Sequence, residues 1–356
     1  MNATRRISLR HYRLAGTLTA GLLAILGCQD DVTSPRGPET EAAEASLAQA
    51  SNTWIARAQT PRRLSGSAVG ASSNAAGEWF VHVFGGNNGD RSNFPSQRYN
   101  VETNTWGGGS GALVNATDLN GVGKIGNRLY FTGGRRCCGE DDLVYNKTWA
   151  YEPSTDRLFQ RANLPRATTS GVTGVIAGKL YVLAGYCSGQ TADPGHCTVE
   201  GQVRQFWRYD PATNTWIVRR QPPHFHAGGA GAVINGKFYV VGDCCIEGTR
   251  TKLDVYDPVT NTWTTLRASL PFEENRITGR QQFSAAVIQN KMFVLQSGSI
   301  NGERMIKGYL YDPVTNTWNE RPIQVPPIFG QIVQVQLDGQ PRLFLPGSPR
   351  SYLYKP

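Results

Sequence analysis

Seven cysteines are the most reactive side chains of this chain of 356 residues. Six of them stand as three close pairs, Cys137 with Cys138, Cys187 with Cys197, and Cys244 with Cys245. In an oxidising compartment an even number of cysteines favours disulfides, and six cysteines allow fifteen pairings. A Cys187–Cys197 bridge is the simplest, because it closes a short loop, and the adjacent pairs then form vicinal bridges or join each other. A bridge from Cys138 to Cys187 is the rival pairing.

The two adjacent cysteine doublets have other interpretations. A vicinal disulfide presents a rigid apolar plate on which a ligand could rest. A metal site is a further alternative, but the doublets lack the CxxC spacing of common zinc sites. We therefore predict structural disulfides at all six positions.

His224 and His226 stand two residues apart and project to one side of an extended strand. With His196 they supply three nitrogen ligands, yet the spacing fixes no carboxylate or fourth ligand, so we predict no metal and no cofactor. His82 lies inside the apolar segment VHVF, where we expect a packed residue.

Acidic residues are expected on the same face as the cysteines, at Asp90, Glu140, Asp141, Asp142, Asp243 and Glu247. Paired carboxylates serve general acid–base catalysis only at particular separations, which this spacing does not fix. The sequence has no nucleophile elbow, no phosphate-binding glycine loop and no HExxH motif, so no catalytic residue is assigned.

A repeat with a period of about fifty residues positions these side chains. The same motif runs from Tyr to Trp in four copies, Tyr99–Trp106, Tyr209–Trp216, Tyr256–Trp263 and Tyr311–Trp318, and a fifth copy ends on Leu158. A short apolar strand that ends at small residues, such as YFTGG at Tyr130–Gly134, precedes the motif. In the DPxTN turn, Pro fixes φ, Asp caps the turn, and Asn tolerates the left-handed conformation.

This pattern resembles the kelch repeat, in which a glycine pair ends strand b, a Tyr lies on strand c and a Trp lies on strand d. The resemblance implies an all-β fold, a six-bladed kelch β-propeller over residues 51–356. Forty glycines, twenty prolines and only 18% charged residues suit such a turn-rich protein. Because a lone four-stranded sheet cannot bury both faces, the stability of each blade depends on its neighbours.

The two ends of the chain predict how the ring closes. Ser51–Trp54 is the end of the motif without its Tyr strand, and SYLYKP at Ser351–Pro356 repeats GYLYDP at Gly308–Pro313 without its Trp strand. We expect the first strand to complete the C-terminal blade, with Tyr354 and Trp54 together supplying the sixth anchor. Closure of this kind removes exposed sheet edges.

The N-terminus is typical of an exported lipoprotein. Four arginines precede an apolar stretch at Leu14–Leu26, so residues 1–27 are predicted to be a signal peptide. Ile25–Cys28 resembles a lipobox, which implies lipid attachment at Cys28 and an anchor in the membrane. Residues 28–50 contain five acids, one arginine and no aromatic residue, which favours a disordered acidic tether. The predicted location is therefore the membrane surface, facing the periplasm or the cell exterior.

The charges of the signal peptide and the tether cancel, so the formal net charge of +9 belongs to the propeller. A basic head favours anionic ligands. Nucleic acid is not expected, because the chain has no Lys/Arg run and no recognition-helix motif. We expect a monomer.

The kelch resemblance implies that the b–c and d–a loops share one face, which carries the ligand in members that bind one. Arg63, Arg166 and Arg280 hold similar positions in different blades, and His224 or His226 holds that position in blade 4. Converging arginines would favour carboxylates or acidic sugars. The candidate ligand-binding residues are Arg63, Asp90, Arg91, Arg135, Arg136, Arg166, His224, His226, Asp243 and Arg280.

The predicted function is binding of a protein or glycan ligand through this loop face, without catalysis. The alternative is an exported carbohydrate-active enzyme, similar to kelch sialic-acid epimerases or to galactose-oxidase-like kelch proteins. The copper-dependent version needs a Tyr–Cys crosslink, and the adjacent Tyr186 and Cys187 do not provide that arrangement.

Overall fold

The computed structural model describes residues 52–62, 65–86, 96–107, 116–136, 143–187, 190–191, 201–244, 246, 248–271, 278–300, 302–319 and 322–356. Residues Ala50–Pro356 form one compact unit, and all of its described regular elements are β-strands. No described residue belongs to a helix that is long and apolar enough to cross a membrane. The predicted signal peptide, Cys28 and the acidic tether lie outside the described residues.

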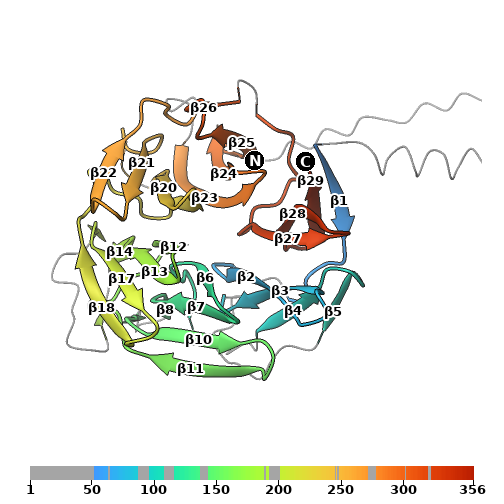
Figure 1. Cartoon of the computed structure of the whole chain (residues 1–356). Helices are drawn as coiled ribbons and strands as arrows, with labels where there is room; N and C mark the ends of the chain where they lie inside the picture. The colour runs from blue at the N-terminus through green and yellow to red at the C-terminus, as the bar shows by residue number, and fades with distance from the viewer. Residues whose placement is uncertain are drawn as a thin grey trace, which may run out of the picture. The chain divides into compact units, whose positions relative to one another are not determined.

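Six four-stranded antiparallel sheets form the blades of a ring (Figure 1). Blade 1 contains β2 (Ala68–Ser73), β3 (Trp79–Phe84), β4 (Gln97–Asn100) and β5 (Thr105–Gly107). Blade 2 contains β6 (Val122–Ile125), β7 (Arg128–Thr132), β10 (Thr148–Glu152) and β11 (Arg157–Arg161). Blade 3 contains β12 (Val172–Ile176), β13 (Lys179–Leu183), β17 (Phe206–Asp210) and β18 (Thr215–Arg219).

The remaining blades follow the same order. Blade 4 contains β19 (Ala230–Ile234), β20 (Lys237–Val241), β21 (Leu253–Asp257) and β22 (Thr262–Thr265). Blade 5 contains β23 (Thr278–Ile288), β24 (Lys291–Ile300), β25 (Glu303–Asp312) and β26 (Thr317–Trp318). Blade 6 contains β27 (Val333–Leu337), β28 (Gln340–Leu345), β29 (Ser351–Lys355) and β1 (Thr53–Arg57). This arrangement confirms the predicted six-bladed propeller.

The first strand closes the ring as the broken repeats predict. β1 pairs with β29 along its whole length, from Thr53 opposite Lys355 to Arg57 opposite Ser351. The Trp54 indole Nε1 donates to the Gln324 carbonyl at 3.0 Å, and its ring lies 5.0 Å from that of Tyr354. The sixth blade is therefore built from both ends of the propeller.

One contact, which we call the Tyr–Asn pair, recurs in every blade and explains the conserved spacing of the motif. The hydroxyl of the strand-c tyrosine donates to the turn residue five positions later, at 2.7 to 2.9 Å. In blade 6 Tyr354 reaches Asn52 across the closure at 2.8 Å. The acceptor has a φ between 54° and 59° in each case, as at Asn261, and Asp156 takes this role in blade 2. Asn and Asp fit because they adopt the left-handed conformation readily.

The Tyr–Asn pairs also join neighbouring blades. Asn261 accepts a hydrogen bond from the Arg220 backbone N–H in the linker that leaves blade 3, and the Trp263 indole donates to the Arg220 carbonyl at 2.7 Å. Arg219 donates to the Tyr256 hydroxyl at 2.8 Å. The motif therefore stabilises each blade and its contact with the preceding blade at once, and the apolar clusters between the sheets complete the core.

The b–c connections differ far more than the blades do. In blades 2 and 3 they form small extra sheets, in which β8 (Arg135–Arg136), β9 (Leu143–Val144) and β15 (Gln190–Thr191) pair, and β14 (Tyr186–Cys187) pairs with β16 (Gly201–Gln202). In blade 5 the connection is a hairpin that lengthens β24 and β25 to ten residues each. The sequence does not reveal this hairpin, because its residues continue the strands instead of interrupting them.

Candidate functional site

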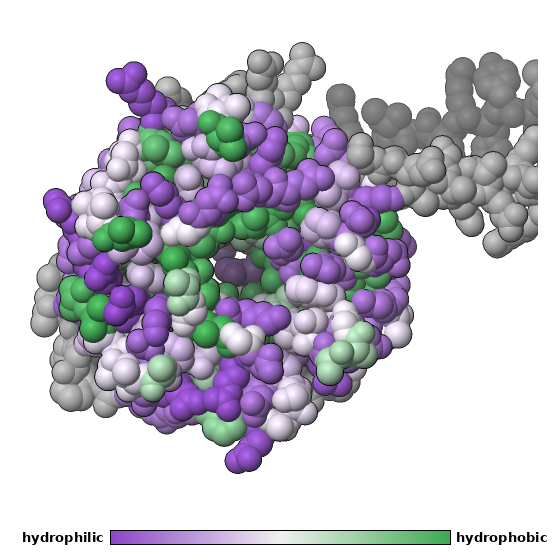
Figure 2. Space-filling view, in the orientation of Figure 1, coloured by the Kyte–Doolittle hydropathy of each residue, from purple (hydrophilic) through white to green (hydrophobic). Residues whose placement is uncertain are grey.

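A cavity of about 730 Å³ lies on the face formed by the d–a and b–c connections, and we call it the mouth cavity. All six blades line it through residues at or just before their innermost strands, which are Gly66, Asp118, Ser170, Gly228, Gln282 and Gln331. Figure 2 shows a hollow at the centre of the ring, with both apolar and polar residues around it. The propeller therefore places one position from each blade around a shared space.

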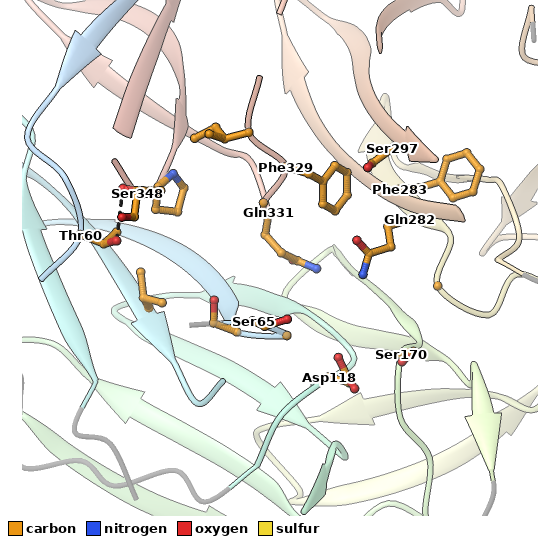
Figure 3. Close-up of a pocket in the computed structure, with 18 of the residues that line it drawn as sticks. Thr60, Ser65, Asp118, Ser170, Gln282, Phe283, Ser297, Phe329, Gln331 and Ser348 are labelled. Atoms are coloured by element: carbon orange, nitrogen blue, oxygen red, sulfur yellow. Dashed lines mark hydrogen bonds between the residues drawn. The ribbon is translucent and has the colours of Figure 1, made fainter. Parts of the chain in front are cut away.

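At the mouth, backbone segments approach one another so closely that only glycine fits at some positions. A Cβ on Gly171 would overlap the carbonyl oxygen of Leu183, and a Cβ on Gly229 would lie 2.6 Å from the carbonyl oxygen of Gly242. Glycine removes this overlap, since it carries no side chain. The longer side chains that remain, including Gln282 and Gln331, extend into the mouth cavity (Figure 3).

The described charged groups of the lining leave an excess of positive charge. Asp118 Oδ2 lies 2.9 Å from Arg135 Nε, so a neighbouring arginine neutralises this carboxylate. Arg62 and Arg304 also line the mouth cavity, and Arg304 Nε donates to the Ser297 hydroxyl at 3.4 Å. The electrostatics of the site therefore favour groups that carry negative charge or carbonyl oxygens.

An apolar wall stands on one side of the mouth cavity. Phe283 comes from β23, and Pro327, Ile328 and Phe329 come from the connection between blades 5 and 6. Figure 3 places Phe283 and Phe329 beside Gln282 and Gln331. A ligand at this site can bury apolar surface against blades 5 and 6 while it hydrogen-bonds to the other blades.

His224 and His226 are not among the residues that line the mouth cavity. His226 is buried, with Nδ1 2.9 Å from the Gly242 carbonyl oxygen and Nε2 3.1 Å from Asp254 Oδ2. His224 Nδ1 lies 3.0 Å from the same carboxylate oxygen, and Thr265 donates to Asp254 Oδ1 at 2.7 Å. Both histidines therefore hold the linker between blades 3 and 4 against β21.

The buried carboxyl of Asp254 is stabilised in its charged form. Burial pushes the pKa of Asp254 upward, but hydrogen bonds from His226 and Thr265 and the charges of both histidines outweigh it and hold the pKa below its ordinary 3.8. The sequence singled out the two histidines but not Asp254, because an acid inside an apolar strand has no spacing signal.

Asp243 also has a structural position. Its side chain is fully buried, and its carboxylate accepts hydrogen bonds from the Ile246 backbone N–H at 2.6 Å and from the Ala227 backbone N–H at 3.2 Å. The predicted ligand-binding acid thus closes the turn after β20 and ties it to the linker from blade 3. It is not among the residues that line the mouth cavity.

Of the predicted arginines, Arg135, Arg136 and Arg166 have described side chains, and none of these three lines the mouth cavity. Arg135 reaches the mouth indirectly through Asp118, Arg136 is exposed on β8, and Arg166 is half-buried before β12. Arg280 lies on β23, and its side chain is outside the described residues, as are Arg63, Asp90 and Arg91. The lining residue in the first linker is Arg62, the neighbour of the predicted Arg63.

Cys244 is disulfide-bonded. The side chains of Cys137, Cys138, Cys187, Cys197 and Cys245 lie outside the described residues, so the pairing stays a prediction. Among the described residues no group of three or more His, Cys, Asp or Glu side chains could hold a metal ion.

His82 packs between blades 1 and 2, as the sequence predicts. It is 1% exposed, its ring lies 5.3 Å from that of Tyr151 of blade 2, and Nε2 lies 2.9 Å from the Ser72 hydroxyl. Burial, with a smaller contribution from the Arg98 charge, lowers the pKa of His82 from 6.5 to about 3. The residue is therefore neutral and part of the core.

The lining residues that the sequence did not single out share one position. Asp118, Ser170 and Gln331 each lie within four residues of the first residue of an innermost strand. Aligning the repeats on the strand-a starts, instead of on the Tyr and Trp of the outer strands, would have identified them.

Comparison with known proteins assigns the chain to a family. No curated protein matches it. Residues 122–331, more than half of the chain, match the family model described as the KLHDC2/KLHL20/DRC7 Kelch-repeats domain. The chain belongs to the kelch-repeat family, whose propellers generally bind proteins.

Proposed function

We propose that this propeller binds a protein ligand at the mouth cavity and that it does so as an exported, lipid-anchored module. The observation that carries the first part is the convergence of all six blades on one cavity of about 730 Å³. A site of this size accepts a segment of polypeptide several residues long.

The chemistry of the lining favours a polypeptide. Gln282 and Gln331 offer both donors and acceptors to a peptide backbone, and the half-buried Ile328 and Phe329 offer apolar contact to side chains. The single described carboxylate of the lining pairs with Arg135, and the guanidinium groups of Arg62 and Arg304 also line the cavity. The ligand we expect therefore presents acidic side chains together with apolar ones.

Export and anchoring are supported by the sequence. The arginine-rich start, the apolar stretch and the lipobox-like residues before Cys28 are those of a lipoprotein signal. An acidic tether of the length of residues 28–50 would let the propeller reach ligands beyond the membrane surface. Replacing Cys28 by Ala tests this part, because the variant would no longer incorporate radiolabelled palmitate and would leave the membrane fraction.

Photo-crosslinking tests the binding site directly. A benzophenone amino acid replaces Gln282 in the mouth cavity or, in the matched control, the exposed Gln336 on β27. After irradiation in intact source cells, mass spectrometry identifies the attached molecules. We expect one discrete protein partner from position 282 that is absent from position 336.

The remaining outcomes decide against the proposal. Equal labelling from both positions would mean that the mouth is not the binding site. A crosslinked glycan without protein at position 282 would replace the protein ligand by a carbohydrate. Chemical conversion of a sugar by the purified full chain would place the protein with the carbohydrate-active kelch enzymes.

A further inference from the structure

Among the described strands, those of blade 5 leave an outer edge that those of the other blades do not. Its strand β25 has ten residues, but β26 pairs only with Tyr311 and Asp312 at the end of β25. The residues at the other end of β25, from Glu303 to Lys307, pair with β24 on one side. Their opposite side faces the connection to blade 6.

In an antiparallel strand, the backbone N–H and C=O groups of successive residues point alternately to opposite sides, and this alternation identifies the residues of β25 whose groups face outward. The Gly308 carbonyl accepts the Ile323 N–H at 2.7 Å, and Leu310 bonds to Asn319 on the same side, so even-numbered residues of β25 face outward. Arg304 and Ile306 therefore also point their N–H and C=O groups outward. No described residue forms a backbone hydrogen bond with either of them on this side.

A groove of about 670 Å³ lies beside this edge, and we call it the edge groove. Arg304, Met305, Ile306 and Lys307 form one wall, and residues 322–327 form the other. Pro322, Pro326 and Pro327 belong to the second wall, and proline has no N–H to donate to a neighbouring strand. The chain's own connection pairs with β25 at Gly308 through Ile323, but no described residue of the connection pairs with Arg304 or Ile306, so this part of the edge stays available.

The charges beside the edge restrict what can bind there. Arg304 and Lys307 carry the positive charge of the groove, and neither forms an ion pair with a described carboxylate. A second copy of β25 would bring like charges together, which disfavours self-association. An extended segment that alternates acidic and apolar residues would match the arginine, the lysine and the apolar side chains of Ile306, Ile323 and Val325.

The edge groove is continuous with the mouth cavity, because Arg304 and Pro327 line both. We infer that an extended acidic segment of the bound protein leaves the mouth and adds to β25 as an outer strand of blade 5. The identity of this segment as part of the mouth ligand rests on the proposed function, whereas the strand-addition site rests on blade 5 itself. Main-chain hydrogen bonds would supply affinity, and the charges would supply specificity.

The test uses the full chain and a capped, fluorescein-labelled peptide of alternating Glu and Val, about seven residues long. We expect saturable binding by fluorescence anisotropy, which weakens as salt rises. The same peptide with alternate backbone nitrogens methylated should bind about tenfold more weakly or less, because it keeps its charges but cannot pair along one edge. Hydrogen exchange should show that the peptide protects the Arg304 and Ile306 amides.

Matched charge reversals complete the test. The double variant Arg304→Glu, Lys307→Glu should lose about tenfold in affinity, whereas Arg267→Glu, at an exposed position in the connection after β22, should retain it. Thermal unfolding of the variants should match that of the parent chain. Absence of peptide binding to the parent chain, or equal binding of the methylated peptide, would overturn the inference.

This result is separable from the proposed function. A protein crosslinked through position 282, together with no peptide binding at β25, would leave the mouth as a protein site and remove the strand-addition site. Peptide binding with amide protection but no crosslink at position 282 would do the reverse.

Discussion

At the outer rim every blade carries the Tyr–Asn pair, whereas at the mouth the positions that the blades contribute hold Gly, Asp, Ser or Gln. The six tyrosine hydroxyls all reach their acceptors at 2.7 to 2.9 Å. The corresponding positions at the mouth include Asp118, Ser170 and Gln331. Repetition at the rim fixes the fold, and the loss of repetition at the mouth marks the surface on which function depends.

Removal of β1 should have the largest effect. A chain that begins at Arg57 loses Trp54 and most of the pairing with β29, so the ring opens and exposes the edge of blade 6. We expect calorimetry to show a much lower and less cooperative thermal transition. Unfolding identical to that of the intact chain would contradict closure by β1.

Acid should destabilise the interface between blades 1 and 2 through His82. Its folded-state pKa of about 3 lies below its ordinary value of 6.5, so the unfolded chain binds more protons between these two values. Stability should therefore fall as the pH decreases through this window, by up to a few kcal/mol. His82→Gln should flatten the dependence of the unfolding free energy on pH in this range, and an unchanged slope would show that His82 does not cause it.

A pair of substitutions at Asn261 should separate the two roles of the rim residue. Asn261→Gly keeps the φ of 56° and loses the hydrogen bonds from Tyr256 and Arg220, whereas Asn261→Ala loses the bonds and also strains the backbone. Alanine should therefore cost about 1 kcal/mol more than glycine. Urea unfolding measures the difference, and equal costs would remove the conformational explanation.

The smallest effect on stability is expected at the mouth. Asp118→Asn breaks the ion pair with Arg135 but keeps a residue that tolerates the φ of 52°. We expect a loss of about 1 kcal/mol or less in urea unfolding, because both side chains remain partly exposed. A cost above that of Asn261→Ala would show that the mouth is part of the structural framework.

The contrast between the rim and the mouth also explains why the fold could be predicted from the sequence and the roles of individual acidic residues could not. The Tyr and Trp spacing predicts the blades and their closure because one contact recurs wherever the motif occurs. Asp254 and Asp243 could not be assigned from spacing, since their roles depend on the linker from blade 3, which is brought to them by the ring. The same holds for His226. Its spacing from His224 predicts that both side chains project to one side, but it does not reveal that both contact the buried carboxylate of Asp254.

The long hairpin of blade 5 was missed for a related reason. Residues 291–300 and 303–312 read as ordinary strands, and only the short β26 reveals that half of β25 extends beyond its neighbour. The unequal lengths of paired strands are a property of the folded sheet. The edge groove therefore became visible only with the structure.

Gln331→Trp tests the central claim most directly, because it fills the mouth cavity while leaving every Tyr–Asn pair in place. The measurement is crosslinking through position 282 in this variant, with thermal unfolding recorded on the same protein and with Gln336→Trp as the matched control. The account predicts that Gln331→Trp loses the protein partner at an unchanged unfolding temperature and that Gln336→Trp retains it. Retention of the partner by a folded Gln331→Trp variant would contradict it.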